Sequence, residues 1–152
     1  SALFRIKMNK KQLNDLIEKA REGMRNAYTI VHNFPVGSAV LTRRGDIYQG
    51  CNTESVISGM GVCAERSAID HAVAHGEYMY DAVVVTSELE EPIKPCGMCL
   101  QYINEFSQIA NKDIEIIMIG SKGKIARSSI RKMLPGGFGP RDLGKDLSKY
   151  RK

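Results

Sequence analysis

Apolar side chains recur at helical spacing close to the N-terminus. Between residues 10 and 27 an apolar residue returns every three or four positions, and Asn9 stands where a helix N-cap is expected. This pattern predicts a helix over residues 10–27. The apolar positions that carry it are Leu13, Leu16, Ile17, Ala20, Met24 and Ala27. A turn region that ends in Phe34-Pro35-Val36-Gly37 follows.

Two short runs of strand-forming residues come next. They lie at 38–42 and 46–51 and flank the turn residues Arg43-Arg44-Gly45. Strand-like runs on either side of a short Gly-containing turn predict an antiparallel hairpin. Residues 52–61 contain Ser, Thr and two Gly, which predicts a loop.

Helix and strand signals then alternate. Apolar residues return at helical spacing over 63–75, where Gly76 stops the pattern, and again over 96–110. Continuous apolar runs at 81–86 and 114–119 predict strands that are buried on both faces. This order predicts an α/β fold, a three-layer α/β/α sandwich around a mixed sheet. We expect the site where helices begin at the strand ends.

The composition fits a single globular domain over residues 1–152. Hydrophobic residues make up 43% and charged residues 26%, and neither a repeat nor a linker divides the chain. No apolar run approaches the roughly 18 residues that a membrane-spanning helix needs. No secretory pattern opens the sequence. We therefore expect a cytoplasmic protein without membrane contact.

The C-terminal part has little regular patterning. Residues 130–134 form a short amphipathic piece, and Phe138 stands among glycines and prolines at 135–140, so we expect its ring to dock elsewhere. The net charge is +5, and the basic residues at the end are Arg141, Lys145, Lys149, Arg151 and Lys152, interleaved with Asp142 and Asp146. A nucleic-acid patch normally clusters more densely, so we favour a solvated tail.

Three of the four cysteines have the spacing of a metal site. Without a secretory pattern, cysteines indicate metal or catalytic thiols rather than disulfides. Cys96 and Cys99 are three residues apart, so their sulfurs share one face if a helix opens there, and Cys63 completes the set. Catalytic zinc is usually held by three protein ligands and keeps a fourth position for water. The expected cofactor is Zn²⁺.

Two charged residues follow Cys63 and suit such a centre. Glu65 is a natural general acid/base, because a carboxylate beside a metal-activated water can move its proton to a leaving group. Three thiolates leave the zinc centre negative, and Arg66 together with two helix N-termini could offset that charge.

Other interpretations of the thiols stay open at this point. Cys96-Gly97-Met98-Cys99 alone could be a redox dithiol, and Cys51 could complete a structural Cys₄ zinc site, although it also suits a small buried apolar position. The other potential ligands are His32, His71 and His75. His71 lies eight residues after Cys63, more than two helical turns away, so we interpret it as structural.

The order of these motifs resembles a known family. Cys63-Ala64-Glu65, followed by Pro95-Cys96 and Cys99, is similar to the signature of zinc nucleoside and nucleobase deaminases. More narrowly, the chain resembles the small homotetrameric cytidine deaminases, a family that includes blasticidin-S deaminase relatives. The likeness runs from Phe34-Pro35-Val36-Gly37 to the Gly/Pro-rich segment 134–140 and covers most of the chain.

The resemblance implies roles for individual residues. Phe34 would lie against the nucleoside, Asn52 and Glu54 would grip the ribose hydroxyl, and the backbone of Ala64 would hold the pyrimidine edge. Phe138 would reach the pocket of a neighbouring subunit in a homotetramer. The implied partners are therefore a small nucleoside and further copies of the chain, with no nucleic acid.

The implied reaction is zinc-dependent hydrolysis of free cytidine or deoxycytidine to uridine or deoxyuridine and ammonia, as in pyrimidine salvage. Departures from the family pattern at residues 55–58, Gly61 and Leu100 keep an alternative open, a deaminase of a modified cytosine nucleoside or related aminated base. An RNA-binding or editing protein and a non-catalytic zinc module are further alternatives.

Overall fold

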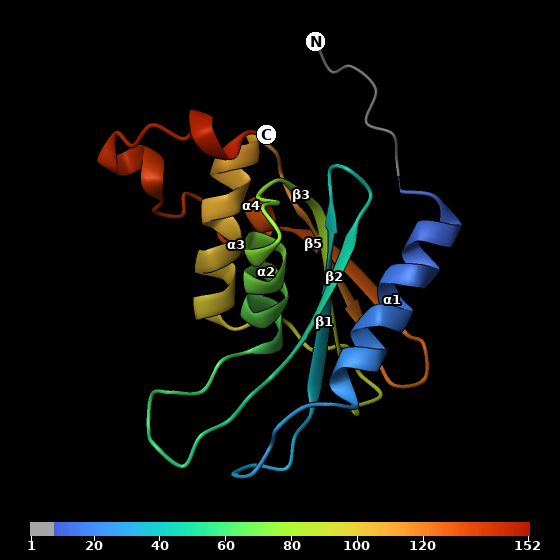
Figure 1. The fold of residues 1–152 in the computed structure, drawn as a ribbon. Coiled ribbons are helices and arrows are strands. Elements are labelled where there is room, and N and C mark those ends of the chain that lie inside the picture. Colours follow the sequence, from blue (N-terminus) through green and yellow to red (C-terminus); the bar gives the residue numbers. More distant parts are fainter. Residues whose placement is uncertain (1–7) are drawn as a thin grey trace.

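The structure, a computed structural model that describes residues 8–152, consists of three layers around one sheet (Figure 1). The α-helices are α1 (Lys10–Met24), α2 (Ala64–Ala74), α3 (Gly97–Ala110) and α4 (Ile130–Met133). The strands are β1 (Val36–Thr42), β2 (Ile47–Cys51), β3 (Tyr80–Ser87), β4 (Glu115–Ile119) and β5 (Ile125–Ser129). Two 3₁₀ turns, Pro140–Leu143 and Ser148–Tyr150, follow α4.

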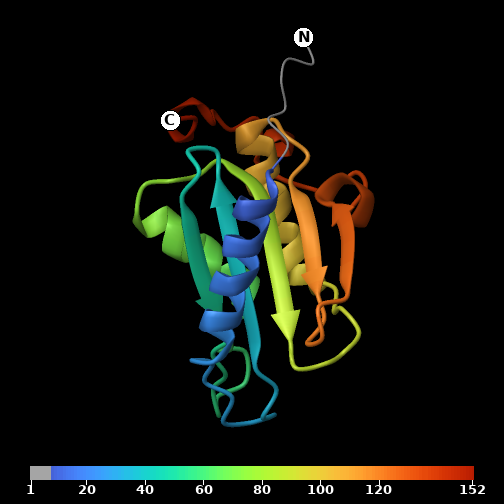
Figure 2. The same cartoon turned by 90° about the vertical axis from the view of Figure 1, so that its right-hand side faces the viewer.

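The sheet is mixed, with the strand order β2-β1-β3-β4-β5. β3 and β4 pair in parallel, and the other neighbouring strands pair antiparallel. Helix α1 covers one face and α2 and α3 cover the other, as Figures 1 and 2 show. The predicted α/β sandwich with a mixed sheet is confirmed.

Strand β3 shows why the sheet is buried on both faces. Ala82 and Val84 pack toward α1, while Val83 and Val85 pack in the second core cluster with α2 and α3. All four side chains are almost completely buried. Successive side chains of a strand point to opposite faces, so a continuous apolar run fills both cores at once.

Most predicted elements are present with small shifts at their ends. The first helix ends at Met24, because residues 25–27 already belong to the following turn. Asn9 caps it as expected, since its side chain accepts from the Gln12 backbone N–H in a capping box. The predictions for the hairpin and for the strands β3 and β4 are confirmed within one or two residues.

Strand β5 is absent from the predictions. It pairs antiparallel with β4 at the edge of the sheet, and its residues are exposed or half-buried, with Ile125 45% exposed. An edge strand with polar residues carries little apolar periodicity. Its pairing with β4, and not its own sequence, determines its conformation.

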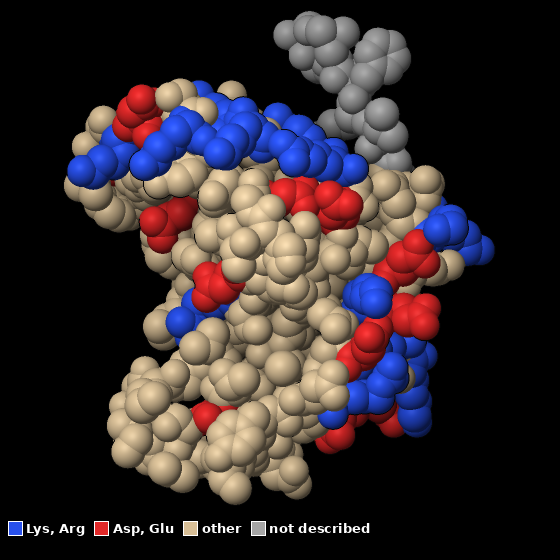
Figure 3. Space-filling view, viewed as in Figure 1, with Lys and Arg blue, Asp and Glu red and all other residues tan. Residues whose placement is uncertain are grey.

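Functional elements gather at one end of the molecule. The loops before β1 and before α2 extend beyond the sheet there, near the start of α2, whereas the C-terminus lies at the opposite end (Figure 1). On the face that Figure 3 shows, the surface of these loops at the lower left carries almost no charged side chains, while a band of Lys and Arg crosses the opposite end. Within residues 8–152, no helix is both long and apolar enough to cross a membrane.

Candidate active site

The three predicted cysteine ligands come together where two helices start. Cys63 is the N-cap residue of α2 and Cys96 is the N-cap residue of α3, and neither side chain caps its helix by a hydrogen bond. Cys99 lies in the first turn of α3 and is buried. Both thiol-bearing helix ends supply partial positive charge to the cluster.

The sulfur positions fit a zinc ion. The Cys63 and Cys96 sulfurs are 3.7 Å apart, the Cys96 and Cys99 sulfurs are 3.6 Å apart, and no disulfide links them. Tetrahedral zinc with Zn–S bonds of about 2.3 Å places its sulfur ligands about 3.8 Å apart. Among residues 8–152, this is the one group of three or more side chains positioned to hold a metal, and Cys51 is not part of it.

One thiol of the cluster is already disposed to ionise. The interaction with the neighbouring Cys99 thiol, helped by Arg66, lowers the pKa of Cys63 to about 5 although burial opposes this. The pKa of the Cys99 thiol is correspondingly raised, by its interaction with Cys63 and by burial. A thiolate is the form that binds metal. The donor chemistry therefore fits a zinc site.

Glu65 lies directly against the thiol cluster. It is 3% exposed, in the first turn of α2, and its Oε2 accepts a hydrogen bond from Cys99 Sγ at 3.3 Å. Burial raises its pKa above the ordinary value. A carboxyl group with a raised pKa holds a proton more readily than an ordinary one and can pass it on.

Arg66 contacts the cluster at Cys63. One guanidinium nitrogen lies 4.0 Å from Cys63 Sγ and 3.4 Å from the Gly61 carbonyl oxygen. The cation therefore lies beside an anionic sulfur, as the sequence suggested. Ala64, between Cys63 and Glu65, is completely buried.

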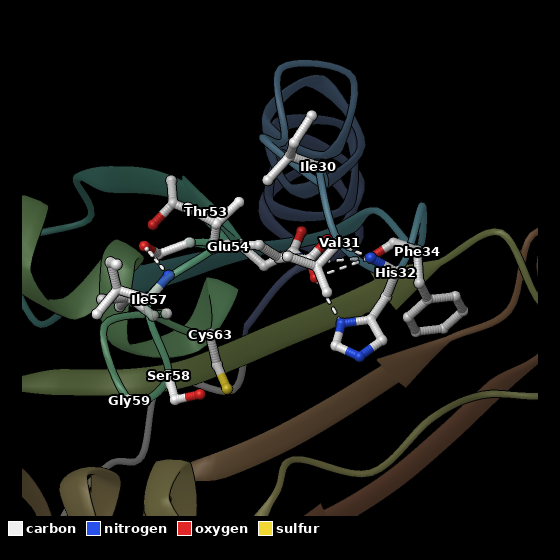
Figure 4. Close-up of a pocket in the computed structure, with 15 residues that line it drawn as sticks. Ile30, Val31, His32, Phe34, Thr53, Glu54, Ile57, Ser58, Gly59 and Cys63 are labelled. Carbon is white, nitrogen blue, oxygen red and sulfur yellow. Dashed lines mark hydrogen bonds and ion pairs between the residues drawn. The ribbon is translucent and has the colours of Figure 1, made fainter.

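A groove of about 820 Å³ opens beside Cys63 and is lined by the two extended loops. Phe34, Asn52, Glu54 and Cys63 all line it, so residues from three parts of the sequence meet there. In Figure 4 the side chains of Cys63 and Ser58 and the ring of His32 point to the same side of these loops. The groove leads from the thiol cluster toward the segment around Phe34.

Asn52 organises the wall of this groove. Its Nδ2 donates to the Phe34 carbonyl oxygen at 2.9 Å, and its Oδ1 accepts from the Val36 N–H at 2.8 Å. The amide therefore fixes the turn that carries Phe34. Both side-chain bonds of Asn52 are thus made to backbone groups. Its backbone N–H also donates to the Val36 carbonyl oxygen on the neighbouring strand.

His32 is a groove residue that sequence reasoning did not place. Its backbone N–H donates to Glu54 Oε2 at 3.0 Å, and its Nδ1 lies 2.5 Å from the same oxygen. Burial alone would raise the pKa of Glu54, but the bonds from His32 hold it below the ordinary value. The only sequence signal is that His32 lies two residues before Phe34, whereas its partner Glu54 lies on another loop.

Phe138 lies outside this groove. Its carbonyl oxygen accepts from Gln101 at 2.8 Å and from Asn104 at 3.0 Å, which fixes the backbone of the segment on α3. Its side chain is 59% exposed. A firmly held backbone with an exposed aromatic ring agrees with the expectation that the ring docks on something else.

Comparison with known proteins identifies the family. Residues 10–120 match the family described as "Cytidine and deoxycytidylate deaminase zinc-binding region". The chain belongs to this family. The site is accordingly that of a zinc-dependent hydrolytic deaminase. The predicted Zn²⁺ cofactor is confirmed, and the cluster of Cys63, Cys96 and Cys99 fits a zinc site.

Relatives agree over most of the chain. The cytidine deaminase of Sporosarcina psychrophila is 38% identical over 128 residues, which cover 84% of this chain and 92% of that protein. A probable cytidine deaminase of Dictyostelium discoideum is 35% identical over 137 residues, 90% of each chain. The crystal structure of cytidine deaminase from Burkholderia pseudomallei has a TM-score of 0.77 at 33% identity, covering 86% of this chain and all of that one.

Proposed function

We propose that this chain hydrolyses free cytidine and deoxycytidine to uridine or deoxyuridine and ammonia, in pyrimidine salvage in the cytoplasm. The observation that carries the proposal is the position of Glu65. Its buried carboxyl group accepts a hydrogen bond from Cys99, and Cys63 of the same thiol cluster lines the groove that also holds Asn52 and Glu54. An acid/base, a metal site and polar groups for a sugar therefore lie next to one another.

The thiolates of Cys63, Cys96 and Cys99 would hold zinc, which when bound lowers the pKa of water and polarises the reacting centre. Glu65 would accept a proton from the attacking water and donate one to the ring nitrogen N3. The same carboxylate would then take the remaining proton from the hydroxyl on C4 and pass it to the amino nitrogen. As the bond between C4 and that nitrogen breaks, the C4 carbonyl forms and ammonia leaves. The raised pKa of Glu65 suits both transfers.

Residues along the groove would bind the nucleoside. Phe34 would lie against it, and the Ala64 backbone would hold the pyrimidine edge. Glu54 would accept a hydrogen bond from a ribose hydroxyl group. Because Asn52 fixes the Phe34 turn through both atoms of its amide, its contribution would include positioning that wall. Recognition of a free hydroxyl favours a nucleoside over a nucleic-acid chain, where that hydroxyl is esterified.

A homotetramer would complete each site with Phe138 from a neighbouring subunit. The exposed ring of Phe138 supports this proposal, as do the nearly uncharged surface of the two loops in Figure 3 and a set of exposed apolar residues. These residues, on the two loops, are Tyr28, Ile30, Val31, Val56, Ile57 and Met60. Exposed apolar patches of this kind mark surfaces that associate.

Subunit mixing tests the shared site. Phe138→Ala and Glu65→Ala should each be nearly inactive alone. If Phe138 completes a neighbour's site, co-refolding the two variants in equal amounts should restore activity in about a quarter of the sites. Random assembly then gives about one site in four both an intact Glu65 and an intact Phe138 from the neighbouring subunit. Sedimentation should show the same oligomer for each variant. A mixture as inactive as its components would contradict the shared site.

A second candidate substrate is a modified cytosine nucleoside. Residues 55–58 line the groove as Ser-Val-Ile-Ser without an aromatic ring, and Val56 is 77% exposed. This wall is therefore open and made of small and aliphatic side chains, and it would accept a substituent on the base or sugar.

Ammonia release from a panel of nucleosides separates the candidates. The panel should contain cytidine, deoxycytidine, base-modified and sugar-modified cytosines, and adenosine, with Glu65→Ala as the blank. Highest kcat/KM for the unmodified nucleosides supports the leading proposal. A preference for one modified cytosine favours the second candidate, and no release from any cytosine compound would overturn both.

A further inference from the structure

A second group of potential metal ligands lies at the far end of helix α2. His71 and His75 are both exposed, and their spacing of four residues puts them on one face of the helix. His71 follows Cys63 by eight residues, roughly 12 Å along the helix axis. The pair is therefore separate from the thiol cluster.

Hydrogen bonds fix which ring nitrogen of each histidine carries the hydrogen. His71 Nδ1 lies 2.9 Å from the Gln49 carbonyl oxygen, and His75 Nδ1 lies 2.8 Å from the His71 carbonyl oxygen. A carbonyl oxygen only accepts, so each Nδ1 carries the hydrogen. In the neutral rings the lone pair is then on Nε2. Metal-binding histidines show the same arrangement, in which the second ring nitrogen donates to a carbonyl or carboxylate.

The spacing of the rings suits a shared ion. Their centroids are 5.0 Å apart and their planes are inclined by 67°. Two imidazoles that bind one ion through Nε2 at about 2.0–2.1 Å, with an angle between 90° and 109°, have centroids roughly 4.5–5.2 Å apart. The observed separation falls within this range.

Tyr48 of β2 forms a wall beside the pair. Its ring centroid lies 5.2 Å from that of His71 and 5.0 Å from that of His75. Its hydroxyl donates to Glu77 Oε2 at 2.6 Å, and this bond is the main reason that its pKa is raised to about 12. The phenol therefore stays neutral, and its hydroxyl is engaged in the hydrogen bond to Glu77. Tyr48 packs against the two imidazole rings and does not act as a metal ligand.

Electrostatics at this position favour a cation. His71 lies in the last turn of α2 and His75 is its C-cap residue. Helix C-termini carry partial negative charge. The buried carboxylate of Glu77, behind Tyr48, adds negative potential without reaching the rings in the described structure.

We propose that His71 and His75 form a second metal site, which binds a divalent transition ion such as Ni²⁺, Cu²⁺ or Zn²⁺ independently of the proposed reaction. Imidazole nitrogen is a preferred ligand for these ions. No third Cys, His, Asp or Glu joins the pair within residues 8–152, so water would fill the other positions. The site would therefore be accessible and weaker than the thiol cluster.

Calorimetric titration of the zinc-loaded protein with Ni²⁺ tests the proposal. His71→Asn and His75→Asn are suitable variants, because the Asn amide nitrogen can replace Nδ1 as donor while Nε2 is lost. His32→Asn, at the opposite end of the molecule, is the matched control. We expect one Ni²⁺ per chain beyond the zinc, affinity at least tenfold weaker in each pair variant, and little change in the control.

Spectroscopy locates the bound ion. Paramagnetic Ni²⁺ should selectively broaden amide resonances around residues 71–77 in wild type, and not in the pair variants. Thermal unfolding without Ni²⁺ should be similar for all four proteins, which shows that the variants fold. Equal Ni²⁺ affinity in the pair variants, broadening centred elsewhere, or no Ni²⁺ binding by wild type would each overturn the site.

Discussion

Oε2 of the buried Glu65 accepts a hydrogen bond from Sγ of Cys99, at 3.3 Å. The proposed acid/base therefore contacts a metal ligand directly, yet the three thiols account for the metal cluster without it. Removal of this carboxyl group should consequently lower the catalytic rate while the bound zinc is retained.

Glu65→Gln should keep zinc but lower kcat by about 10²–10⁴-fold, the usual contribution of general acid/base catalysis. The amide has the size of the carboxyl group but cannot exchange protons with the substrate. Zinc content by mass spectrometry and ammonia release together measure the two effects. Glu22→Gln, on α1 across the sheet, is the control that should retain activity. Near-normal turnover in Glu65→Gln would contradict the assigned role.

Replacing one thiol should remove the metal. Cys96→Ser should lose zinc and activity together, because a hydroxyl is a much poorer zinc ligand than a thiolate. Cys51→Ala should retain both, since Cys51 lies outside the cluster. A thiol count provides a second readout, with one reactive thiol per zinc-loaded chain and four after chelation and unfolding. Loss of zinc in Cys51→Ala would instead support a Cys₄ site.

Tyr48→Phe should destabilise the fold without changing catalysis. It removes the bond to Glu77, which is 5% exposed, and loss of a hydrogen bond to a buried charged group costs about 1–3 kcal/mol. Denaturant unfolding at pH 7 measures this difference. The kcat of the variant should match that of wild type, because Tyr48 packs at the C-terminal end of α2.

The same variant makes a pH-dependent prediction. Burial raises the pKa of Glu77, but bonds from Tyr48 and Thr42 outweigh it and hold the pKa below the ordinary 4.5. A lowered pKa in the folded state stabilises the protein above the ordinary value, and this contribution is lost as the pH falls through the folded pKa. The stability gap between wild type and Tyr48→Phe should therefore narrow below about pH 4. A constant gap would argue against the role of Glu77 ionisation.

Local sequence signals were sufficient for the layers and for the metal cluster. The apolar run of β3 predicts a doubly buried strand, and Cys63 and Cys96 each begin a helix whose apolar spacing is clear. Edge strand β5 lacks such a signal, since its pairing with β4 and not its composition determines it.

The groove depends on contacts that no local pattern encodes. Glu54 bonds to His32 because isolated bridges join Thr53 to both Tyr28 and Val62, which brings the two loops together. The motif order indicated that Phe34, Asn52 and Glu54 belong to one site. It did not indicate that Asn52 holds the Phe34 turn or that a histidine pairs with Glu54.

Gly50 sets the distance between the metal helix and the sheet. A Cβ at this position would collide with the Ala68 amide nitrogen and lie 2.6 Å from the Ala64 carbonyl oxygen, both in α2. The neighbouring backbone cannot yield without moving the helix, so Gly50→Ala should cost about 1–3 kcal/mol or more. Because α2 carries Glu65 and β2 leads into Asn52, we also expect kcat/KM to fall by about 10²-fold.

Gly97→Ala is the matched control for Gly50→Ala. A Cβ on Gly97 would meet no atom within 4 Å, although this glycine lies between two thiol-bearing positions at the start of α3. Alanine also lowers the conformational entropy cost of a helix by about 0.5–1 kcal/mol relative to glycine. Gly97→Ala should therefore keep its zinc and activity and unfold at the same or a higher temperature. If both variants lost activity equally, close packing of α2 on β2 would not be what positions Glu65.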